Sequence, residues 1–177
     1  MKKSVLLWEL IGVVVIFILG SVLHFAFELS GEWKPMALIA AVNESVWEHL
    51  KLAFWPSVAY AVFEYTRLKK SANNFLVAKA VGIYVMPVAI AALFYSYTAV
   101  LGESILAIDI LIFGVAIAVG QLASYKLLTS RQLPQSLNKF ALIALVILGI
   151  VFSLFTFYPP RLGIFRDPVT GGYGIPE

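Results

Sequence analysis

The sequence contains no cysteine and few charged residues, and both shortages narrow what the protein can do. Without cysteine, the 177-residue chain cannot form disulfides, thiolate metal sites or iron–sulfur clusters, and it has no cysteine nucleophile. Charged residues make up only 13% of the chain, whereas 61% of its residues are hydrophobic. A soluble domain has about 25% charged residues. The composition predicts an integral membrane protein in which any metal would be held by His, Asp and Glu.

Long apolar stretches predict an all-α fold, a polytopic helical membrane bundle of about five transmembrane helices. The expected spans are Val5 to Phe27, Leu50 to Thr66, Phe75 to Thr98, Ile105 to Leu127 and Phe140 to Tyr158. Residues 1–158 are therefore expected to form the transmembrane bundle, and residues 159–177 a Pro- and Gly-rich tail outside it.

The stretch from Pro35 to Arg67 is too long for one ordinary span. A straight helix over it would reach about 45 Å, whereas the hydrocarbon core is about 30 Å thick. One interpretation is an amphipathic or re-entrant helical segment in the outer interface, followed by a span that begins near Leu50. The other is a long helix bent at Pro56, where a backbone donor is missing.

Lys and Arg are distributed unevenly between the two ends of these spans, and cytoplasmic flanks are enriched in them. With the N-terminus in the cytoplasm, the inner set is Lys2, Lys3, Arg67, Lys69, Lys70, Lys79, Lys126, Arg131 and Lys139. The outer set is Lys34, Lys51, Arg161 and Arg166. An odd number of spans then leaves the C-terminus outside. Because the basic residues serve orientation, the net charge of +3 does not indicate nucleic acid, and the expected partner is the lipid bilayer.

Most of the uncommon ionisable residues fall in the outer half of this layout. His24 and Glu28 lie one helical turn apart, and Glu44, Glu48 and Lys51 form a second stripe. A charged side chain at the bilayer centre costs about 2.5–3.5 kcal/mol, so several together have to be paired, protonated, hydrated or metal-bound. Only Glu9 and Glu64 lie near the inner surface, where they can snorkel or pair with Lys and Arg.

The outer cluster contains suitable ligands for a divalent metal. The candidate ligands are His24, Glu28, Glu44, Glu48 and His49. This mixture of nitrogen and oxygen suits Zn²⁺, Mn²⁺ or Fe²⁺ better than Ca²⁺. His49 lies roughly 100° around the helix from Glu48, so both can reach one ion only if the helix is distorted or the ion lies between the stripes. The spacing matches neither H-E-x-x-H nor the E-x-x-H pair of di-iron bundles.

If the protein is an enzyme, the catalytic candidates are Glu44, Glu48 and His49. A glutamate desolvated beside Trp47 could act as general base in a hydrolysis, with a metal or Lys51 stabilising the developing negative charge. Asn43 is expected to support this cluster. Two other interpretations stay open: a proton- or ion-coupled transporter, in which these carboxylates carry protons or cations, and a structural or partner-binding protein, in which the cluster fixes helix register.

Small residues recur in the stretch from Ile105 to Leu127. Gly114 with Ala118, and Ala116 with Gly120, are spaced for close contact between helices. Gln121 and Ser124 in the same stretch are expected to hydrogen-bond to a neighbouring helix.

The last residues, PPRLGIFRDPVTGGYGIPE from Pro159, contain too much Pro and Gly for a helix. They are nevertheless too apolar for a solvated tail. We expect them to fold back over the outer mouth of the bundle, with Arg161 or Arg166 pairing with a carboxylate and Asp167 opening a turn. The alternative is a loose tail that rests on the lipid headgroups.

Several segments carry a resemblance to a known family: HFAFELSG, AVNESVWEHLKLAFWP, KAVGIYVMP, FYSYTAVLGESILAIDI and FTFYPPRLGIFRDPVTGGYGI. Over nearly the whole chain the sequence resembles a bacterial family of small polytopic membrane proteins, domain of unknown function 6512. The resemblance implies a multi-pass protein of the bacterial inner membrane and implies no activity, substrate or cofactor.

Overall fold

The described part of the protein, residues 2–176, is a bundle of five α-helices. A computed structural model describes residues 2–176. The helices are α1 (Lys2–Leu29), α2 (Val46–Leu68), α3 (Phe75–Leu101), α4 (Leu106–Leu128) and α5 (Ser136–Phe157), with short 3₁₀ helices η1 (Lys34–Leu38) and η2 (Gly163–Phe165). Helices α1, α3, α4 and α5 are long and apolar enough to cross a membrane. The predicted all-α fold, a helical membrane bundle, is thus confirmed, and the bounds of the five helices match the expected ones to within a few residues. Among residues 2–176, however, four helices rather than five have the length and hydropathy of a membrane span, because α2 carries ionisable residues along its length.

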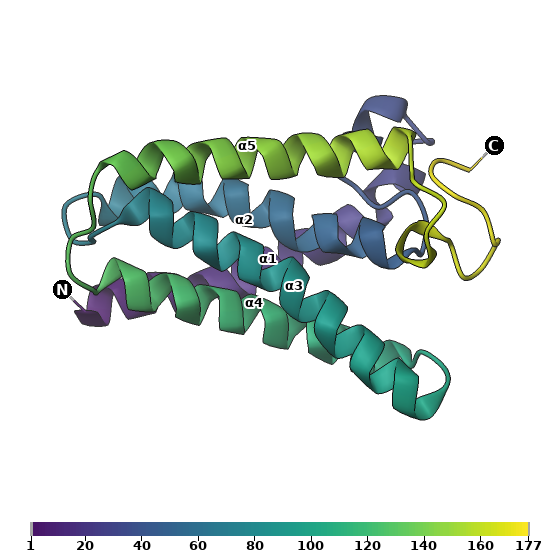
Figure 1. The fold of residues 1–177 in the computed structure, drawn as a ribbon, viewed down its shortest axis with the longest axis horizontal. Helices are drawn as coiled ribbons and strands as arrows, with labels where there is room; N and C mark the ends of the chain where they lie inside the picture. The colour runs from purple at the N-terminus through teal and green to yellow at the C-terminus, as the bar shows by residue number, and fades with distance from the viewer. Residues whose placement is uncertain (1, 177) are drawn as a thin grey trace.

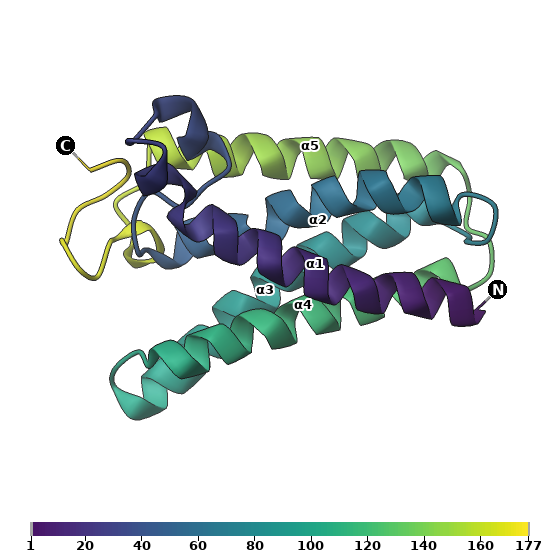
Figure 2. The same cartoon turned by 180° about the vertical axis from the view of Figure 1, so that it is seen from behind.

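Helix α2 is the polar helix of the bundle, and it packs against α1, α3 and α5 (Figure 1). Helix α4 lies on the other side of the bundle, where it contacts α1 and α3 (Figure 2). The two termini lie at opposite ends (Figure 1). We call the end with the N-terminus, the α2–α3 link and the α4–α5 link the basic end. The opposite end, with residues 30–45 and the segment after α5, is the tail end.

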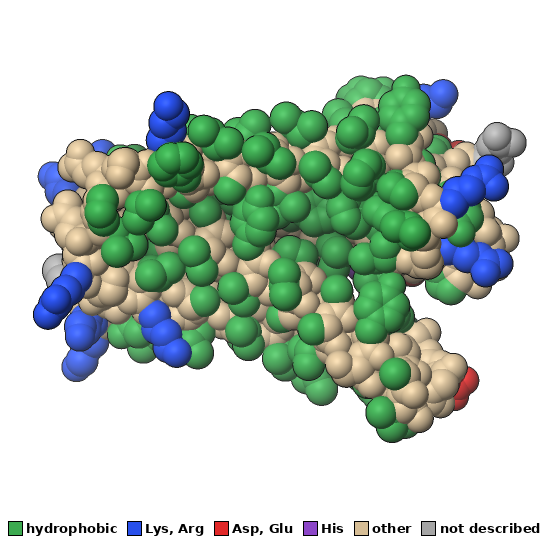
Figure 3. Space-filling view, in the orientation of Figure 1, with side chains coloured by type: hydrophobic (Ala, Val, Ile, Leu, Met, Phe, Trp, Pro, Cys, Tyr) green, Lys and Arg blue, Asp and Glu red, His purple; other side chains and the backbone are tan. Residues whose placement is uncertain are grey.

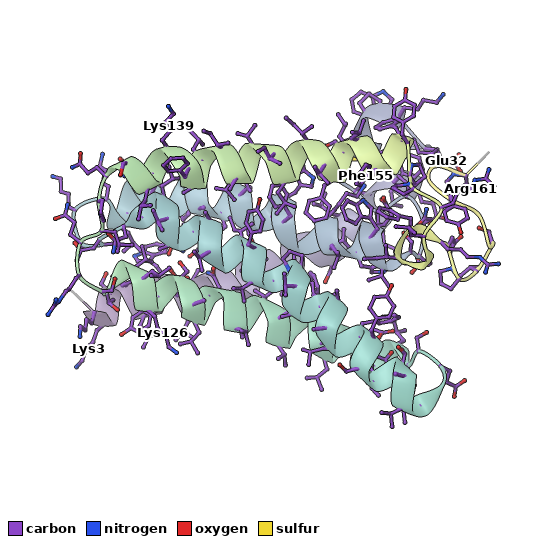
Figure 4. All side chains as sticks on the ribbon, in the orientation of Figure 1. Lys3, Glu32, Lys126, Lys139, Phe155 and Arg161 are labelled. Atoms are coloured by element: carbon purple, nitrogen blue, oxygen red, sulfur yellow. The ribbon has the colours of Figure 1, made fainter. Side chains whose placement is uncertain are left out.

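Charged side chains are concentrated at these two ends. Figure 3 shows Lys and Arg at both ends of the molecule, with a broad apolar surface along the helices between them. Lys3, Lys126 and Lys139 lie at or near the basic end, and Glu32 and Arg161 lie at the tail end (Figure 4). Many large apolar side chains on the outward helix faces are exposed, such as Val14 at 58% and Ile150 at 59%. This is the surface that lipid chains would cover.

The chain between α1 and α2 is mostly not helical. After η1, residues 39–45 form turns, and α2 begins at Val46 with Ser45 as its N-cap, whose hydroxyl accepts from the Glu48 amide. The expected helical segment before the second span is therefore only the short η1. The alternative of one long helix bent at Pro56 is wrong, because the break lies before residue 46.

Pro56 lies inside α2 and leaves the Leu52 carbonyl without its helical donor. Gly20 of α1 packs against this carbonyl, since a Cβ on Gly20 would lie 2.7 Å from the Leu52 oxygen. Helices α3 and α4 meet in the same way, because a Cβ on Gly82 would lie 2.7 Å from the carbonyl oxygen of Gly120. Close helix contact at Gly120 was predicted from the small residues. At Gly114, which was predicted in the same way, the nearest neighbouring atom to an added Cβ is in the Phe17 ring at 3.7 Å, which is ordinary van der Waals contact.

We predict that Gly82→Ala lowers the free energy of unfolding by about 1–3 kcal/mol, because its methyl group meets backbone that cannot move alone. The control Gly114→Ala has room for its methyl and gains about 0.5–1 kcal/mol of helix propensity. Thermal unfolding in detergent measures both. Equal unfolding temperatures for the two variants would show that α3 and α4 do not approach this closely.

Candidate metal centre

Three of the predicted ligands come together at the tail end, between α1 and the start of α2. His24 projects from the last turns of α1, His49 lies in the first turn of α2, and Glu44 lies in the loop just before it. The Nε2 atoms of the two histidines are 3.2 Å apart. Oε2 of Glu44 lies 3.6 Å from Nε2 of His24 and 3.5 Å from Nε2 of His49. These three atoms form a nearly equilateral triangle.

The size of this triangle fits a transition metal. With metal–ligand bonds of about 2.0–2.2 Å, two ligands of a tetrahedral ion lie roughly 3.3–3.6 Å apart. The three observed edges of 3.2, 3.5 and 3.6 Å are close to this range. The side chains of His24, His49 and Glu44 are 27%, 31% and 48% exposed. The group is therefore open enough to water for an ion to enter and to keep a fourth position free.

His49 is oriented for this role by the backbone. Its Nδ1 lies 2.9 Å from the Ser45 carbonyl oxygen. Because a carbonyl only accepts, Nδ1 carries the proton and Nε2 of the neutral ring is free to bind an ion. Nδ1 of His24 is buried without a hydrogen-bond partner, so His24 is held by packing rather than by a second polar contact.

Glu44 stays ionised in this position. The neighbouring His24 imidazole holds the pKa of the Glu44 carboxyl below its usual value; burial acts in the opposite direction, and His49 adds to the lowering. Asp167 lies close enough to raise the pKa of Glu44 slightly by its own charge. Burial would raise the pKa of Asp167, but hydrogen bonds from Thr170, Val169 and the Glu44 amide hold it below its usual value. Both carboxylates are thus anionic at neutral pH.

The structure places Glu48 in a different network. Lys51 is completely buried, and its ammonium donates to Glu48 Oε2 at 2.6 Å, to the Ala37 carbonyl at 2.9 Å and to Thr156 Oγ1 at 2.7 Å. Thr156 donates to Oε1 of Glu48 at 2.8 Å, and the Val42 amide donates to Oε2 at 3.1 Å. Every donor of the ammonium is satisfied, and both carboxylate oxygens are bonded. This network ties η1 and α5 to α2.

The other candidate residues lie around these two groups. Glu28 is exposed and lies outside the triangle. Asn43 donates to the Gly174 carbonyl at 2.7 Å and accepts from the Ser45 amide at 2.9 Å, which joins the loop to the chain's last residues. The Trp47 ring packs against Phe165 of η2 with ring centroids 4.7 Å apart.

The arginines of the last segment do not pair as expected. Arg161 and Arg166 are exposed, and within residues 2–176 neither forms an ion pair with a carboxylate. Arg166 instead donates to the Gly171 carbonyl at 3.4 Å, inside its own turn. Hydrogen bonds and aromatic packing, rather than charge, attach this segment to the bundle.

A large hollow lies elsewhere in the described chain. A groove of about 1160 Å³ runs between α2, α3 and α5, and it opens on the face shown in Figure 3. Its lining is mostly apolar and includes no His, Asp or Glu. Such a groove suits an acyl chain. Its ionisable lining residues are Lys79, which is paired with two carboxylates, and the tyrosines Tyr65 and Tyr158.

The sequence analysis missed Thr156, the neutral residue that joins Lys51 to Glu48. A hydroxyl in a largely apolar helix was the available signal, but such a residue more often bonds to its own helix. The Phe152 carbonyl lies 3.2 Å from the Thr156 hydroxyl oxygen, but the single hydroxyl proton has a shorter contact, 2.8 Å, to Glu48 Oε1.

Comparison with family models matches residues 1–175 to a family of unknown function, DUF6512. The chain belongs to the DUF6512 family. Comparison of this DUF6512 chain with curated proteins and with solved structures finds no match. Membership of this family, noted from the sequence as a resemblance, is thus confirmed, and any activity has to be inferred from the geometry.

For this DUF6512 protein we predict that Lys51→Met lowers the free energy of unfolding by about 3–5 kcal/mol, because it leaves the Glu48 carboxylate buried without a counter-charge. Adding Glu48→Gln to Lys51→Met removes the stranded charge and restores part of the stability. Lys34→Met, which changes an exposed lysine at the same end, is the control and has little effect. Thermal unfolding in detergent measures all three. A double variant no more stable than Lys51→Met would contradict the assigned pairing.

Proposed function

We propose that the protein is a membrane-bound metal protein, in which His24, Glu44 and His49 hold a divalent transition ion of the zinc class. The observation that supports this most strongly is the triangle of ligand atoms, whose edges are those of one face of a tetrahedral site. Two imidazoles and one carboxylate are a ligand set that zinc enzymes use for catalysis. A purely structural zinc site would have four protein ligands, whereas this group offers three.

The proposed chemistry is hydrolysis at the tail end. Held by His24, Glu44 and His49, such an ion would supply an acidified water and a Lewis acid for a carbonyl or phosphoryl oxygen. Glu44 supplies the negative charge that offsets the ion, and the Ser45 carbonyl keeps the His49 ring in the binding tautomer. Glu48 is not assigned a role in this reaction, because both of its oxygens are bonded within the bundle.

The first test is metal binding by the purified protein. We expect wild type to bind about one Zn²⁺ per chain by calorimetry and metal analysis. His24→Ala and His49→Ala should each weaken binding by more than the 10–100-fold that loss of an outer-shell partner costs. The control Glu28→Gln removes a carboxylate one turn from His24 but outside the triangle, and should bind as wild type does. Binding that is unchanged in both histidine variants would refute the site.

Metal binding should also depend on pH in a defined direction. Imidazole binds an ion only in its neutral form, so protons compete with the ion and the zinc affinity should fall as the pH drops into the mildly acidic range. Glu44 does not limit binding there, because its pKa lies below the usual value for Glu. Zinc titrations from mildly acidic to mildly alkaline pH measure this. A zinc affinity that does not change over this pH range would indicate that carboxylates bind the ion without the histidines.

The hydrolytic activity requires a screen, since the proposal names a reaction class and no substrate. A panel of chromogenic carboxylic and phosphoric esters, assayed with and without Zn²⁺, should show metal-dependent hydrolysis that His49→Ala abolishes and Glu28→Gln retains. Zinc binding without hydrolysis of any ester in the panel would support the metal site and contradict the proposed hydrolytic activity.

We further propose that the tail end faces the outside of a bacterial inner membrane, with the N-terminus in the cytoplasm. The excess of Lys and Arg at the basic end supports this orientation. Because the chain has no cysteine, a single cysteine introduced at either end reports on which side of the membrane that end lies. A membrane-impermeant maleimide on spheroplasts should label Glu103→Cys in the α3–α4 loop but not Lys70→Cys in the α2–α3 link. The reverse pattern would invert the topology.

A further inference from the structure

A second group of ionisable residues lies in the basic half of the bundle, away from the metal centre. Glu9 of α1, Glu64 of α2 and Lys79 of α3 meet in the interior, where their side chains are 3%, 0% and 4% exposed. The sequence analysis expected Glu9 and Glu64 to snorkel or to pair near the inner surface. They pair, but they are fully enclosed between helices. Lys79 lies one helical turn after Phe75, inside an apolar span. A lysine at such a position was the sequence feature that could have indicated a buried ion pair.

Lys79 lies between the two carboxylates and contacts both. Its ammonium is 2.7 Å from Oε1 of Glu9, and it also contacts Oε2 of Glu64. Ser124 of α4 donates to the same Glu9 oxygen at 2.9 Å, and Gln121 donates to the Glu9 backbone carbonyl at 3.2 Å. The four helices α1 to α4 therefore meet at this group.

The charges of this group do not balance. Two ionised carboxylates and one ammonium carry a net charge of −1 in a site closed to water. An uncompensated buried charge is so costly that the group takes up a proton instead. Among the described residues, three buried oxygens of this group have no hydrogen-bond partner: Oε2 of Glu9 and both oxygens of Glu64, of which Oε2 contacts the ammonium of Lys79. One proton taken up by either carboxyl group would remove the excess charge.

Within residues 2–176, the surrounding side chains offer no other positive charge to this group. From α2, the Tyr60 hydroxyl donates to the Trp8 carbonyl at 2.5 Å, and Arg67 is exposed, with its guanidinium over the Trp8 and Phe63 rings. From α4, Lys126 is exposed and Gln121 and Ser124 are neutral. A metal ion is disfavoured, because the ammonium of Lys79 already occupies the space between the carboxylates.

We propose that Glu9 and Glu64, with Lys79, form a binding site for one exchangeable proton inside the membrane bundle. The carboxylic acid releases its proton to water at the basic end and becomes a carboxylate, which leaves the site with a charge of −1. Because the closed bundle does not tolerate that charge, release requires the helices to part enough for water to enter. The site thereby couples protonation to the packing of α1 and α2 against α3 and α4.

Infrared difference spectroscopy of the purified protein tests this proposal directly. At neutral pH the wild type should show a protonated carboxylic C=O band that disappears at alkaline pH. Glu9→Gln and Glu64→Gln should each abolish the band, because Lys79 neutralises the one remaining carboxylate. Glu28→Gln, an exposed glutamate outside the group, should retain it. Absence of the band in wild type, or its persistence in both single variants, would overturn the proposal.

Thermal unfolding gives a second, independent readout. The folded state holds one more proton than the unfolded chain at neutral pH, so the stability of the wild type falls as pH rises above the ordinary glutamate pKa of about 4.3 and stops falling once the folded protein has lost the proton. Glu64→Gln should remove this slope, so that its unfolding temperature passes that of wild type at alkaline pH. Parallel curves for the two proteins would contradict a bound proton. Loss of the infrared band on adding NaCl at constant pH would show a cation site instead.

Discussion

The structure depends on one constraint: helix α2 carries ionisable side chains in surroundings that do not tolerate unpaired charge. Glu48, Lys51 and Glu64 are all buried along its length. Each needs a polar partner that the lipid cannot supply, and each has one on another element. Glu48 and Lys51 both bond to Thr156 of α5, and Lys51 also donates to the Ala37 carbonyl. Glu64 contacts Lys79 of α3. The positions of the neighbouring helices around α2 follow from these polar contacts as much as from apolar packing.

Most of the fold could be predicted from hydropathy, because a span of the bilayer requires a long apolar helix and little else. The break before α2 could not be predicted, because it depends on two local contacts. Ser45 caps the helix, and the Asn43 side chain accepts a hydrogen bond from the Ser45 amide. Either residue could equally have lain inside a continuous helix. How the last segment attaches was also beyond the sequence, since its contact with the bundle passes through a backbone carbonyl and the Phe165 ring.

The candidate site was predicted in part. The residue types and the pairing of the first two helices brought His24 close to His49. Glu48 was included among the candidate ligands, with the condition that the angle of roughly 100° from His49 allows a shared ion only if the helix is distorted or the ion lies between the stripes. In the structure Glu48 is bonded to Lys51 and Thr156 instead. The sequence could not separate Glu44 from the helical stripe, because that required knowing that α2 begins at Val46. The sequence also could not show that Lys51 would point inward toward η1. A lysine side chain has an apolar stem and a charged end, so it could equally have extended outward to the headgroups.

The claim on which the functional account depends is that two imidazoles and one carboxylate share an ion at the tail end. X-ray absorption spectroscopy of the zinc-loaded protein tests it most directly. The account predicts a first shell of nitrogen and oxygen at about 2.0–2.2 Å, with the outer-shell scattering of two imidazole rings that falls to one ring in His24→Ala. A zinc spectrum with oxygen ligands alone, and the same in wild type and variant, would contradict it.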